Sequence, residues 1–126
     1  MDSVGKKHGL SLILLHGSQV DGRVHKKSDV DIAVLRRNVN KKLDLLALIY
    51  SLSEKFENDK IDVLDLTTAD PLTAFAVARK NKLLSGSKQD YDKFLKKAFM
   101  KYGDYVPYLE KEREFVKQKI ERYVAN

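Results

Sequence analysis

Three short runs of hydrophobic residues, at 11–16, 30–36 and 61–66, stand between more polar segments of the chain. Each run has the length of a β-strand and is rich in Val, Ile or Leu. Apolar runs of this length are typical of strands buried in a sheet. We therefore predict three strands, and a fourth, short edge strand at Leu83-Leu84 before a Ser-Gly-Ser turn.

Between the predicted strands, hydrophobic residues recur every three or four positions, as they do on the buried face of a helix. Asn38 and Asn40 can cap the first of these helices, which ends before Asn58. Asp70 begins the second, because Asp is a good N-cap and Pro71 fits the first helical position. The order of elements is then strand, loop, strand, helix, strand, helix, short strand, helix.

The loop between the first two strands is too short for a typical crossover helix, so we expect these strands to be antiparallel. The predicted fold is α/β (α+β), with a small mixed, largely antiparallel sheet flanked by helices. The 126 residues suffice for a single domain with one modest core. It consists of a lead-in at 1–10, loose or a short helix, an α/β core at 11–84, and C-terminal helices at 88–126.

The C-terminal region carries one apolar stripe at helical spacing, from Tyr91 to Tyr123. We expect a break or a kink where Gly103 and Pro107 interrupt it. Beyond Leu109 the stripe is narrow and flanked by charged residues. A stripe of this width usually packs on the protein's own core, which we prefer to the alternative that it docks a partner.

Composition and charge narrow the classes of function. Cysteine is absent, which excludes disulfides, a thiolate zinc site and a cysteine nucleophile. No apolar run is long enough to span a bilayer, and we expect a cytoplasmic protein that does not bind membranes. The net charge of +6 suits an anionic partner or a lysine-rich solvated surface. Charges of both signs alternate along the chain, which argues against a dedicated surface for nucleic acid.

The strongest functional signal is Gly17-Ser18, followed after ten residues by Asp29-Val30-Asp31. A Gly-Ser turn after a strand can wrap backbone N–H groups around a phosphate. Because side chains alternate along a strand, Asp29 and Asp31 share one face and form half of a divalent metal site. Together these features suit nucleotidyl transfer, in which two metal ions hold the attacking and leaving oxygens at the α-phosphorus.

A third carboxylate usually completes such a site, and the third predicted strand offers two. Asp62 lies between β-branched apolar residues, where a buried acid is costly unless it is paired or binds a metal. Asp65 has the opposite parity and lies nearer the strand end. We favour Asp62 as the third ligand and interpret Asp65 as an acid with a structural partner, an interpretation that stays open for Asp62 too.

Residues around the Gly-Ser turn carry weaker signals. Ser18 can hydrogen-bond the β- or γ-phosphate, or it is a plain turn serine. Arg23, Lys26 and Lys27 can neutralise a triphosphate, or they are solvated loop charges. His16 can approach the site, although we interpret it as a partly buried histidine at a strand end.

These residues resemble the minimal nucleotidyltransferases of the polymerase-beta superfamily, and within it the MntA-type antitoxins. The resemblance covers residues 10–100 and rests on the Gly-Ser turn and on two further segments, Ser28-Asp29-Val30-Asp31-Ile32-Ala33-Val34-Leu35 and Ile61-Asp62-Val63-Leu64-Asp65-Leu66. It implies two Mg²⁺ ions, held by Asp29, Asp31 and Asp62. It also implies ATP as the substrate, with contacts from Gly17, Ser18, Arg23 and Ser28.

Members of the MntA type attach AMP from ATP to a tyrosine of a HEPN-domain RNase toxin, which blocks RNA cleavage. The resemblance therefore implies a protein adenylyltransferase that neutralises a HEPN toxin in a heteromeric complex, with no direct contact to nucleic acid. Two alternatives remain: transfer to a small hydroxylated molecule, as in aminoglycoside-modifying enzymes, and a non-catalytic antitoxin that acts by binding alone.

The sequence departs from the family's pattern at two positions. Asp21 stands before Gly22 where relatives often carry Arg, so phosphate binding is weaker unless Arg23 substitutes. His16 stands before the Gly-Ser turn where relatives often have an aromatic residue. Neither departure removes a metal ligand, so we expect an active enzyme.

Overall fold

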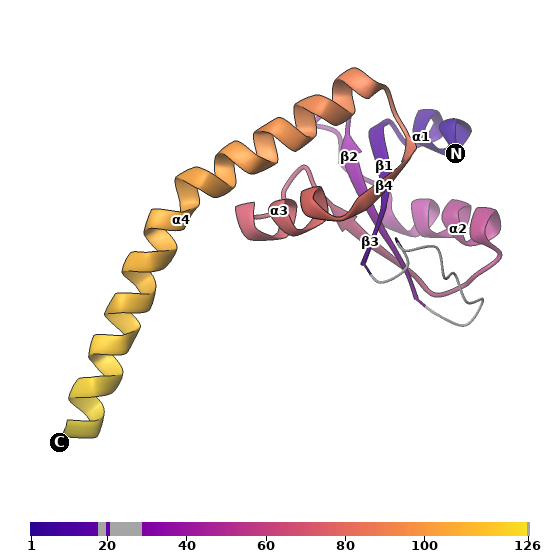
Figure 1. Ribbon diagram of the computed structural model, residues 1–126. Coiled ribbons are helices and arrows are strands. Elements are labelled where there is room, and N and C mark those ends of the chain that lie inside the picture. The colour runs from indigo at the N-terminus through magenta and orange to yellow at the C-terminus, as the bar shows by residue number, and fades with distance from the viewer. Residues whose placement is uncertain (18–19, 21–28, 126) are drawn as a thin grey trace.

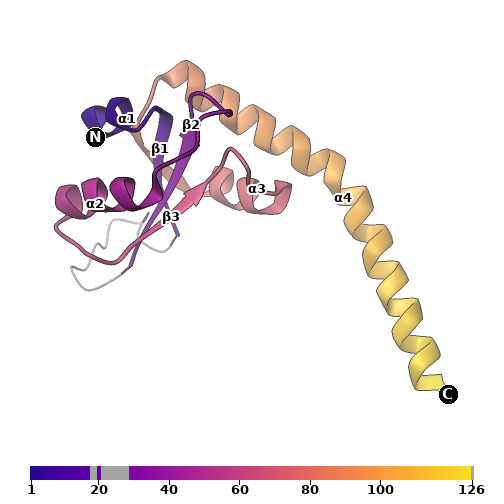
Figure 2. The same cartoon turned by 180° about the vertical axis from the view of Figure 1, so that it is seen from behind.

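The protein, shown as a computed structural model that describes residues 1–17, 20 and 29–125, is a four-stranded sheet covered by helices on both faces (Figures 1 and 2). The elements are α1 Asp2–Lys7, β1 Leu10–His16, β2 Val30–Arg36, α2 Leu45–Phe56, β3 Ile61–Asp65, α3 Pro71–Arg79, β4 Asn81–Ser85 and α4 Lys88–Ala125.

The strands lie in the order β3-β2-β1-β4. β1 pairs antiparallel with both β2 and β4, and β2 pairs parallel with β3. The predicted antiparallel arrangement of the first two strands is therefore confirmed, as is the mixed, largely antiparallel sheet. The parallel pair follows from the chain order, because α2 crosses over between β2 and β3.

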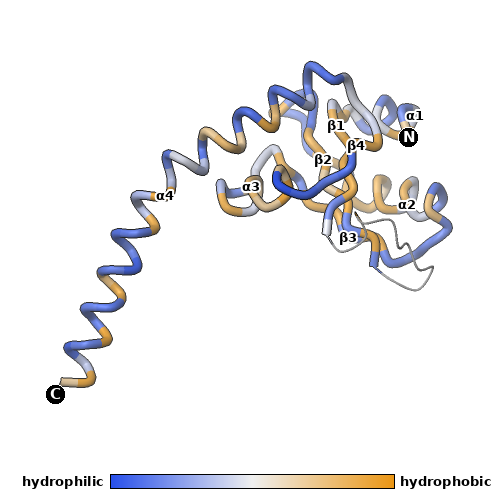
Figure 3. The backbone as a smooth tube through the Cα atoms, viewed as in Figure 1, coloured by the Kyte–Doolittle hydropathy of each residue, from blue (hydrophilic) through white to orange (hydrophobic). Residues whose placement is uncertain are grey.

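Each face of the sheet has its own hydrophobic core. The strands between these cores are largely hydrophobic, as the orange colour along β1 and β2 in Figure 3 shows. On one face Ile13 and Ile32 pack with Leu48 and Leu52 of α2, and α1 adds Val4. On the other face Leu12 and Leu14 are buried with α3 and the first part of α4, through Val77, Phe94 and Ala98. Burying a side chain of this size contributes about 1.5–3 kcal/mol. Successive side chains of β1 enter the two cores in turn and are apolar on both faces, which explains the continuous hydrophobic run of this strand.

The start of α2 corrects the prediction that Asn38 or Asn40 caps this helix. Asp44 is the N-cap, and its side chain accepts a hydrogen bond from the backbone N–H of Ala47 at 3.2 Å. The Asn38 side chain instead accepts the backbone N–H of Asn40 at 3.0 Å and closes a local turn. The cap of α3 is confirmed, because the Asp70 side chain accepts the N–H of Thr73 at 2.8 Å.

The C-terminal region is one continuous helix, so the expectation of several helices or of a break at Gly103 and Pro107 is wrong, whereas the alternative expectation of a kink agrees with its bend. Pro107 lies inside α4, and the helix bends partway along its length while it continues (Figures 1 and 2). A proline removes one backbone hydrogen bond and favours a bend, and the surrounding turns keep the helix intact.

The last part of α4, residues 109–125 and here called distal α4, leaves the body of the protein (Figure 1). Its apolar side chains are largely exposed, so the prediction that this stripe packs on the protein's own core is wrong. The reason is length. A helix of 38 residues is roughly 57 Å long, whereas a seven-residue strand spans roughly 23 Å. Within the part of the chain that the structure describes, none of the helices combines the length and apolar character needed to cross a bilayer.

Candidate active site

One residue from each strand forms a line across the sheet. In the strand register Asn81 of β4 is opposite His16 of β1, His16 is opposite Asp31 of β2, and Asp31 is opposite Asp62 of β3. We call these four residues the cross-sheet row. Each shares its strand parity with a residue of the core beneath α3 and α4, such as Leu14 and Leu64. The row therefore projects from that face, at the end of the sheet where β1 finishes and β2 begins.

The register brings Asp31 and Asp62 side by side on neighbouring parallel strands. Asp31 is partly buried, and Asp62 is exposed. Among the described residues, neither carboxylate forms an ion pair. Two adjacent carboxylates repel each other unless a cation neutralises them, and a divalent cation with oxygen ligands does this best. The donor chemistry and the openness of the pair therefore fit a divalent metal.

Asp29 lies one residue before β2 and has the same parity as Asp31. Asp29 is exposed. No three His, Cys, Asp or Glu side chains within the described residues are close enough together to hold a metal ion. The strand register thus sets Asp31 beside Asp62, and Asp29 precedes β2 with the parity of Asp31. Six residues that the sequence analysis considered lie outside the described residues: Ser18, Asp21, Arg23, Lys26, Lys27 and Ser28.

Gly17 brings backbone against the Asp31 carboxylate. It has φ +78°, a conformation that only glycine adopts at no steric cost, and a Cβ placed there would overlap the Asp31 side chain. Position 17 therefore requires glycine for two reasons: the left-handed backbone conformation and the close approach to Asp31 of β2. This is how the first half of the sequence motif touches the second.

His16 links the two carboxylates electrostatically. Burial lowers the pKa of His16, and the negative charges of Asp31 and Asp62 oppose that shift. Both carboxylates are therefore near enough to act on the imidazole, which is partly buried. The sequence interpretation of His16 as a partly buried strand-end histidine holds, and the register adds that it stands directly beside Asp31.

Asp65 has the structural role that the sequence analysis predicted for it. Its carboxylate lies 2.9 Å from Nε of Arg36 and accepts the backbone N–H of Thr67 at 3.0 Å. Its parity places it on the sheet face opposite Asp62, with Ile61 and Val63. Asp65 therefore closes the far end of β3, and Asp62 is the acid of this strand that stands beside Asp31.

Sequence reasoning missed Asn81, the fourth member of the row. Its side-chain amide donates to the carbonyls of Val77 and Ala78 at 2.9 and 3.1 Å, and its carbonyl accepts the Tyr91 hydroxyl at 2.6 Å. Asn81 thus ties the end of α3 and the start of α4 to the row. An Asn after a helical run is a frequent helix-end residue, so the sequence offered a sign of a cap but none of its place beside His16.

A sheet of this topology that presents paired aspartates beside a glycine turn defines a nucleotidyltransferase fold. The family described as "Polymerase beta, Nucleotidyltransferase" matches residues 2–90, and the chain belongs to it. Within this family the chain is of the MntA type.

A relative named protein adenylyltransferase MntA, from Shewanella oneidensis, is 33% identical over 93 residues. The match covers 74% of this chain and 66% of the Shewanella protein, just under two thirds of that relative's length. A solved toxin-antitoxin structure with AMP-PNP superposes with a TM-score of 0.71 at 28% identity, covering 94% of this chain and 93% of the other. A complex of a tri-AMPylated Shewanella oneidensis HEPN toxin with MNT antitoxin gives 0.61 at 26% identity, covering 89% and 83%.

Proposed function

We propose that this chain is an antitoxin that transfers AMP from ATP to a tyrosine of a HEPN-domain toxin and thereby neutralises it. The observation that carries the proposal is the cross-sheet row, which sets Asp31 beside Asp62 next to the glycine turn of an MntA-type chain. In the reaction the tyrosine oxygen bonds to the α-phosphorus of ATP, the bond from that phosphorus to the β-phosphate oxygen breaks, and pyrophosphate leaves. The added bulk and charge would block RNA cleavage.

Asp29, Asp31 and Asp62 would hold two Mg²⁺ ions. The support lies in the adjacent positions of Asp31 and Asp62, which form no ion pair within the described part of the chain, and in the position of Asp29 just before β2. Bound Mg²⁺ would neutralise the triphosphate and make the α-phosphorus more electrophilic. Asp62, the most exposed member of the pair, would also take the proton of the incoming tyrosine hydroxyl.

The turn after β1 would hold the nucleotide. Gly17 brings backbone next to Asp31, so phosphate oxygens bound by this turn would lie beside the carboxylates. We assign contacts with the triphosphate to Gly17, Ser18, Arg23 and Ser28. Because ATP is available in the cytoplasm and a chain without cysteine has no disulfide that needs an oxidising compartment, we propose that the activity lies there.

The toxin would bind along distal α4. Four apolar residues of distal α4 are spaced seven, four and three positions apart, which puts them on one side of the helix: Leu109, Val116, Ile120 and Tyr123. Val116, Ile120 and Tyr123 are 47%, 57% and 87% exposed. A groove between this side of the helix and α3 is lined by Leu109, Val116 and Ile120 together with Leu72 of α3. An unpacked apolar seam of this kind suits a helix of a protein partner.

The decisive experiment is the intact mass of the cognate HEPN toxin after incubation with this chain, ATP and Mg²⁺. We expect a gain of one or more AMP units, and no gain with the Asp29→Ala/Asp31→Ala variant. The unaltered chain and the Asp29→Ala/Asp31→Ala variant should both form a complex with the toxin. A stable complex with no mass gain from the unaltered chain would favour an antitoxin that acts by binding alone.

A further inference from the structure

The fold gathers three separate pairs of cations into one cleft. Lys6 and Lys7 end α1, Arg36 ends β2 and is followed by Arg37, and Lys41 and Lys42 lie in the connection to α2. All six line a single surface cleft, which we call the basic cleft, and among the described residues the one acid that lines it is Asp44. Its charge balance is therefore +5, against +6 for the whole chain. The fold thus adds Lys6 and Lys7 to a stretch, residues 36–42, that carries four cations and no acid.

Within the part of the chain that the structure describes, most of these cations have no ionic partner that would explain their position. Arg36 is occupied, because its guanidinium pairs with Asp65 and donates to the carbonyls of Val39 and Lys41 at 3.2 and 2.8 Å. Asp44 caps α2 with its carboxylate. Within the described residues the remaining five, Lys6, Lys7, Arg37, Lys41 and Lys42, form no ion pair.

Five uncompensated cations around a concave surface repel one another and create a strong positive potential. At the cleft wall, burial and then the charge of Lys7 lower the pKa of the His8 imidazole, and the charge of Asp44 opposes this shift. Binding an anion would relieve this repulsion. Lys6 and Lys7 are also favourable at the end of a helix, but α1 has six residues and cannot account for the other two pairs.

The form of the cleft indicates an extended polyanion. All five cations are exposed and carried on flexible side chains, so they are not held around one point as a site for a single phosphate requires. Long mobile cations instead suit a phosphate chain, where affinity comes from the release of condensed counterions. No Phe, Tyr or Trp among the described residues lines the cleft, so it has no surface on which bases could stack.

We propose that the basic cleft binds the phosphodiester backbone of a nucleic acid without reading its sequence. The cleft lies at the end of β2 opposite Asp31, so this binding is separate from the nucleotide site and does not depend on the proposed function. It adds a nucleic-acid contact, which the alternating charges of the sequence argued against.

The test is fluorescence anisotropy of the full chain with a labelled RNA strand of about twenty nucleotides and a DNA duplex of about that length, between roughly 50 and 200 mM salt. We expect binding that weakens steeply with salt. Lys41→Gln/Lys42→Gln should remove two phosphate contacts, which at a slope of about 0.7 per contact means about 25-fold weaker RNA binding near 0.1 M salt. Whichever probe binds more tightly identifies the source of the backbone.

The matched control is Lys117→Gln/Lys119→Gln, which removes the same charge from distal α4. Its RNA binding should stay close to that of the unaltered chain. The proposal is overturned by equal weakening in both variants, by absence of binding to either probe, or by displacement of the probe with stoichiometric ATP. AMP transfer by Lys41→Gln/Lys42→Gln should be unchanged, so failure of this proposal and failure of the proposed enzyme are distinguished.

Discussion

Asp31 and Asp62 are direct partners across the parallel strands β2 and β3, so their side chains leave the sheet next to each other on the face covered by α3 and α4. A shift of one residue in this register would send the Asp62 carboxylate to the other face. The apolar neighbours Ile61 and Val63, which pack in the opposite core, hold the register in place. The cores thus fix the geometry of the candidate active site.

The two acids of β3 should respond differently to loss of charge. Asp62→Asn should lower AMP transfer by about 100-fold or more with little change in stability, because Asp62 is exposed. Asp65→Asn should keep most activity but lower the free energy of unfolding by about 1–3 kcal/mol, because Arg36 loses its partner. Transfer rates and urea unfolding of both variants check this, and an inactive but stable Asp65→Asn would reverse the assignment.

Gly17 should tolerate no side chain. Gly17→Ala forces a Cβ into the Asp31 carboxylate and keeps a left-handed backbone, which alone costs about 1–2 kcal/mol. We expect Gly17→Ala to lower the free energy of unfolding, measured by scanning calorimetry, and to weaken ATP binding, measured by titration calorimetry. The matched control is Gly103→Ala in α4, where a Cβ meets nothing within 4 Å and should stabilise the helix by up to about 1 kcal/mol. Equal effects of the two substitutions would contradict this account.

Asn81 should couple α3 to α4. Asn81→Ala removes hydrogen bonds to two α3 carbonyls and to the Tyr91 hydroxyl, and should destabilise the fold by about 1–3 kcal/mol. Tyr91→Phe removes the last of these bonds alone and should cost less. A double-mutant cycle measures the coupling, which we expect to be about 0.5 kcal/mol or more. Strict additivity would mean that the bond at 2.6 Å contributes nothing to stability.

The strands could be predicted from the sequence because each is a buried apolar run whose length and pattern are local properties. The start of α2 could not, because Arg36 donates to the carbonyls of Val39 and Lys41 and so holds residues before the helix in a turn. The same applies to distal α4. Its apolar stripe predicts a helix, but whether the body reaches that far depends on the size of the folded sheet.

The candidate site divides in the same way. The spacing of Gly17, Asp29 and Asp31 is visible in the sequence. The apolar neighbours of Asp62, together with parity and position in the strand, distinguished it from Asp65. The place of Asn81 in the cross-sheet row required the pairing of β1 with β4, two strands that are far apart in the chain. The cations at 36–42 are visible in the sequence, but the basic cleft required the fold, which brings Lys6 and Lys7 of α1 beside them.

Acid should weaken the fold through its histidines. Burial lowers the pKa of His8 in the folded state below 6.5, so the unfolded chain takes up a proton first. Stability is therefore full above pH about 6.5 and falls as pH drops from there toward the lowered pKa. His16, whose pKa is also lowered, acts in the same direction.

Substituting His8 by Gln should flatten this dependence in part, because Gln keeps a polar group for Ser51, whose hydroxyl lies 2.9 Å from the His8 ring, and does not titrate. Urea unfolding between about pH 7 and 5 measures the slope. A slope that stays as steep in His8→Gln as in the unaltered chain would assign the whole effect to other groups.

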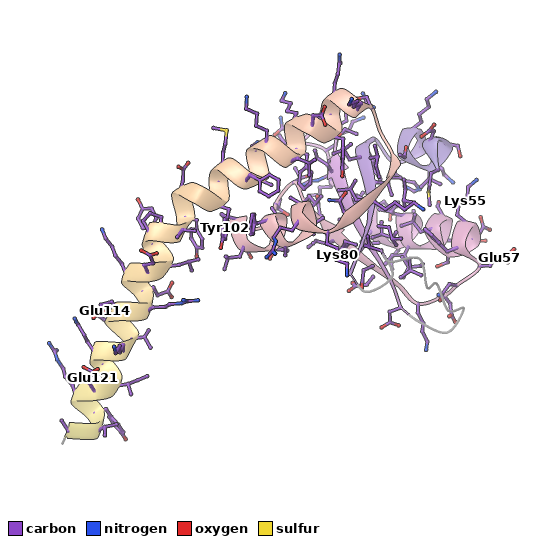
Figure 4. The ribbon with its side chains drawn as sticks, viewed as in Figure 1. Lys55, Glu57, Lys80, Tyr102, Glu114 and Glu121 are labelled. Carbon is purple, nitrogen blue, oxygen red and sulfur yellow. The ribbon has the colours of Figure 1, made fainter. Side chains whose placement is uncertain are left out.

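Distal α4 should decide whether the toxin binds. Glu114 and Glu121 mark this part of the helix in Figure 4, well beyond Tyr102, whose ring stacks on Phe75 of α3 at 3.6 Å. Val116→Glu/Ile120→Glu places two charges in the proposed interface and should weaken the toxin complex at least about 30-fold without unfolding the body, because both side chains are exposed.

The control for this prediction is Lys111→Gln/Gln118→Glu, which lowers the net charge by the same two units on the outer side of the helix. Its complex with the toxin should be unchanged in sedimentation or calorimetry. AMP transfer by Val116→Glu/Ile120→Glu should fail at low toxin concentration and recover at high concentration, since docking is impaired and the site is intact. Loss of transfer at every toxin concentration would show that these residues act on the site itself, and equal loss in the control would assign docking to charge alone.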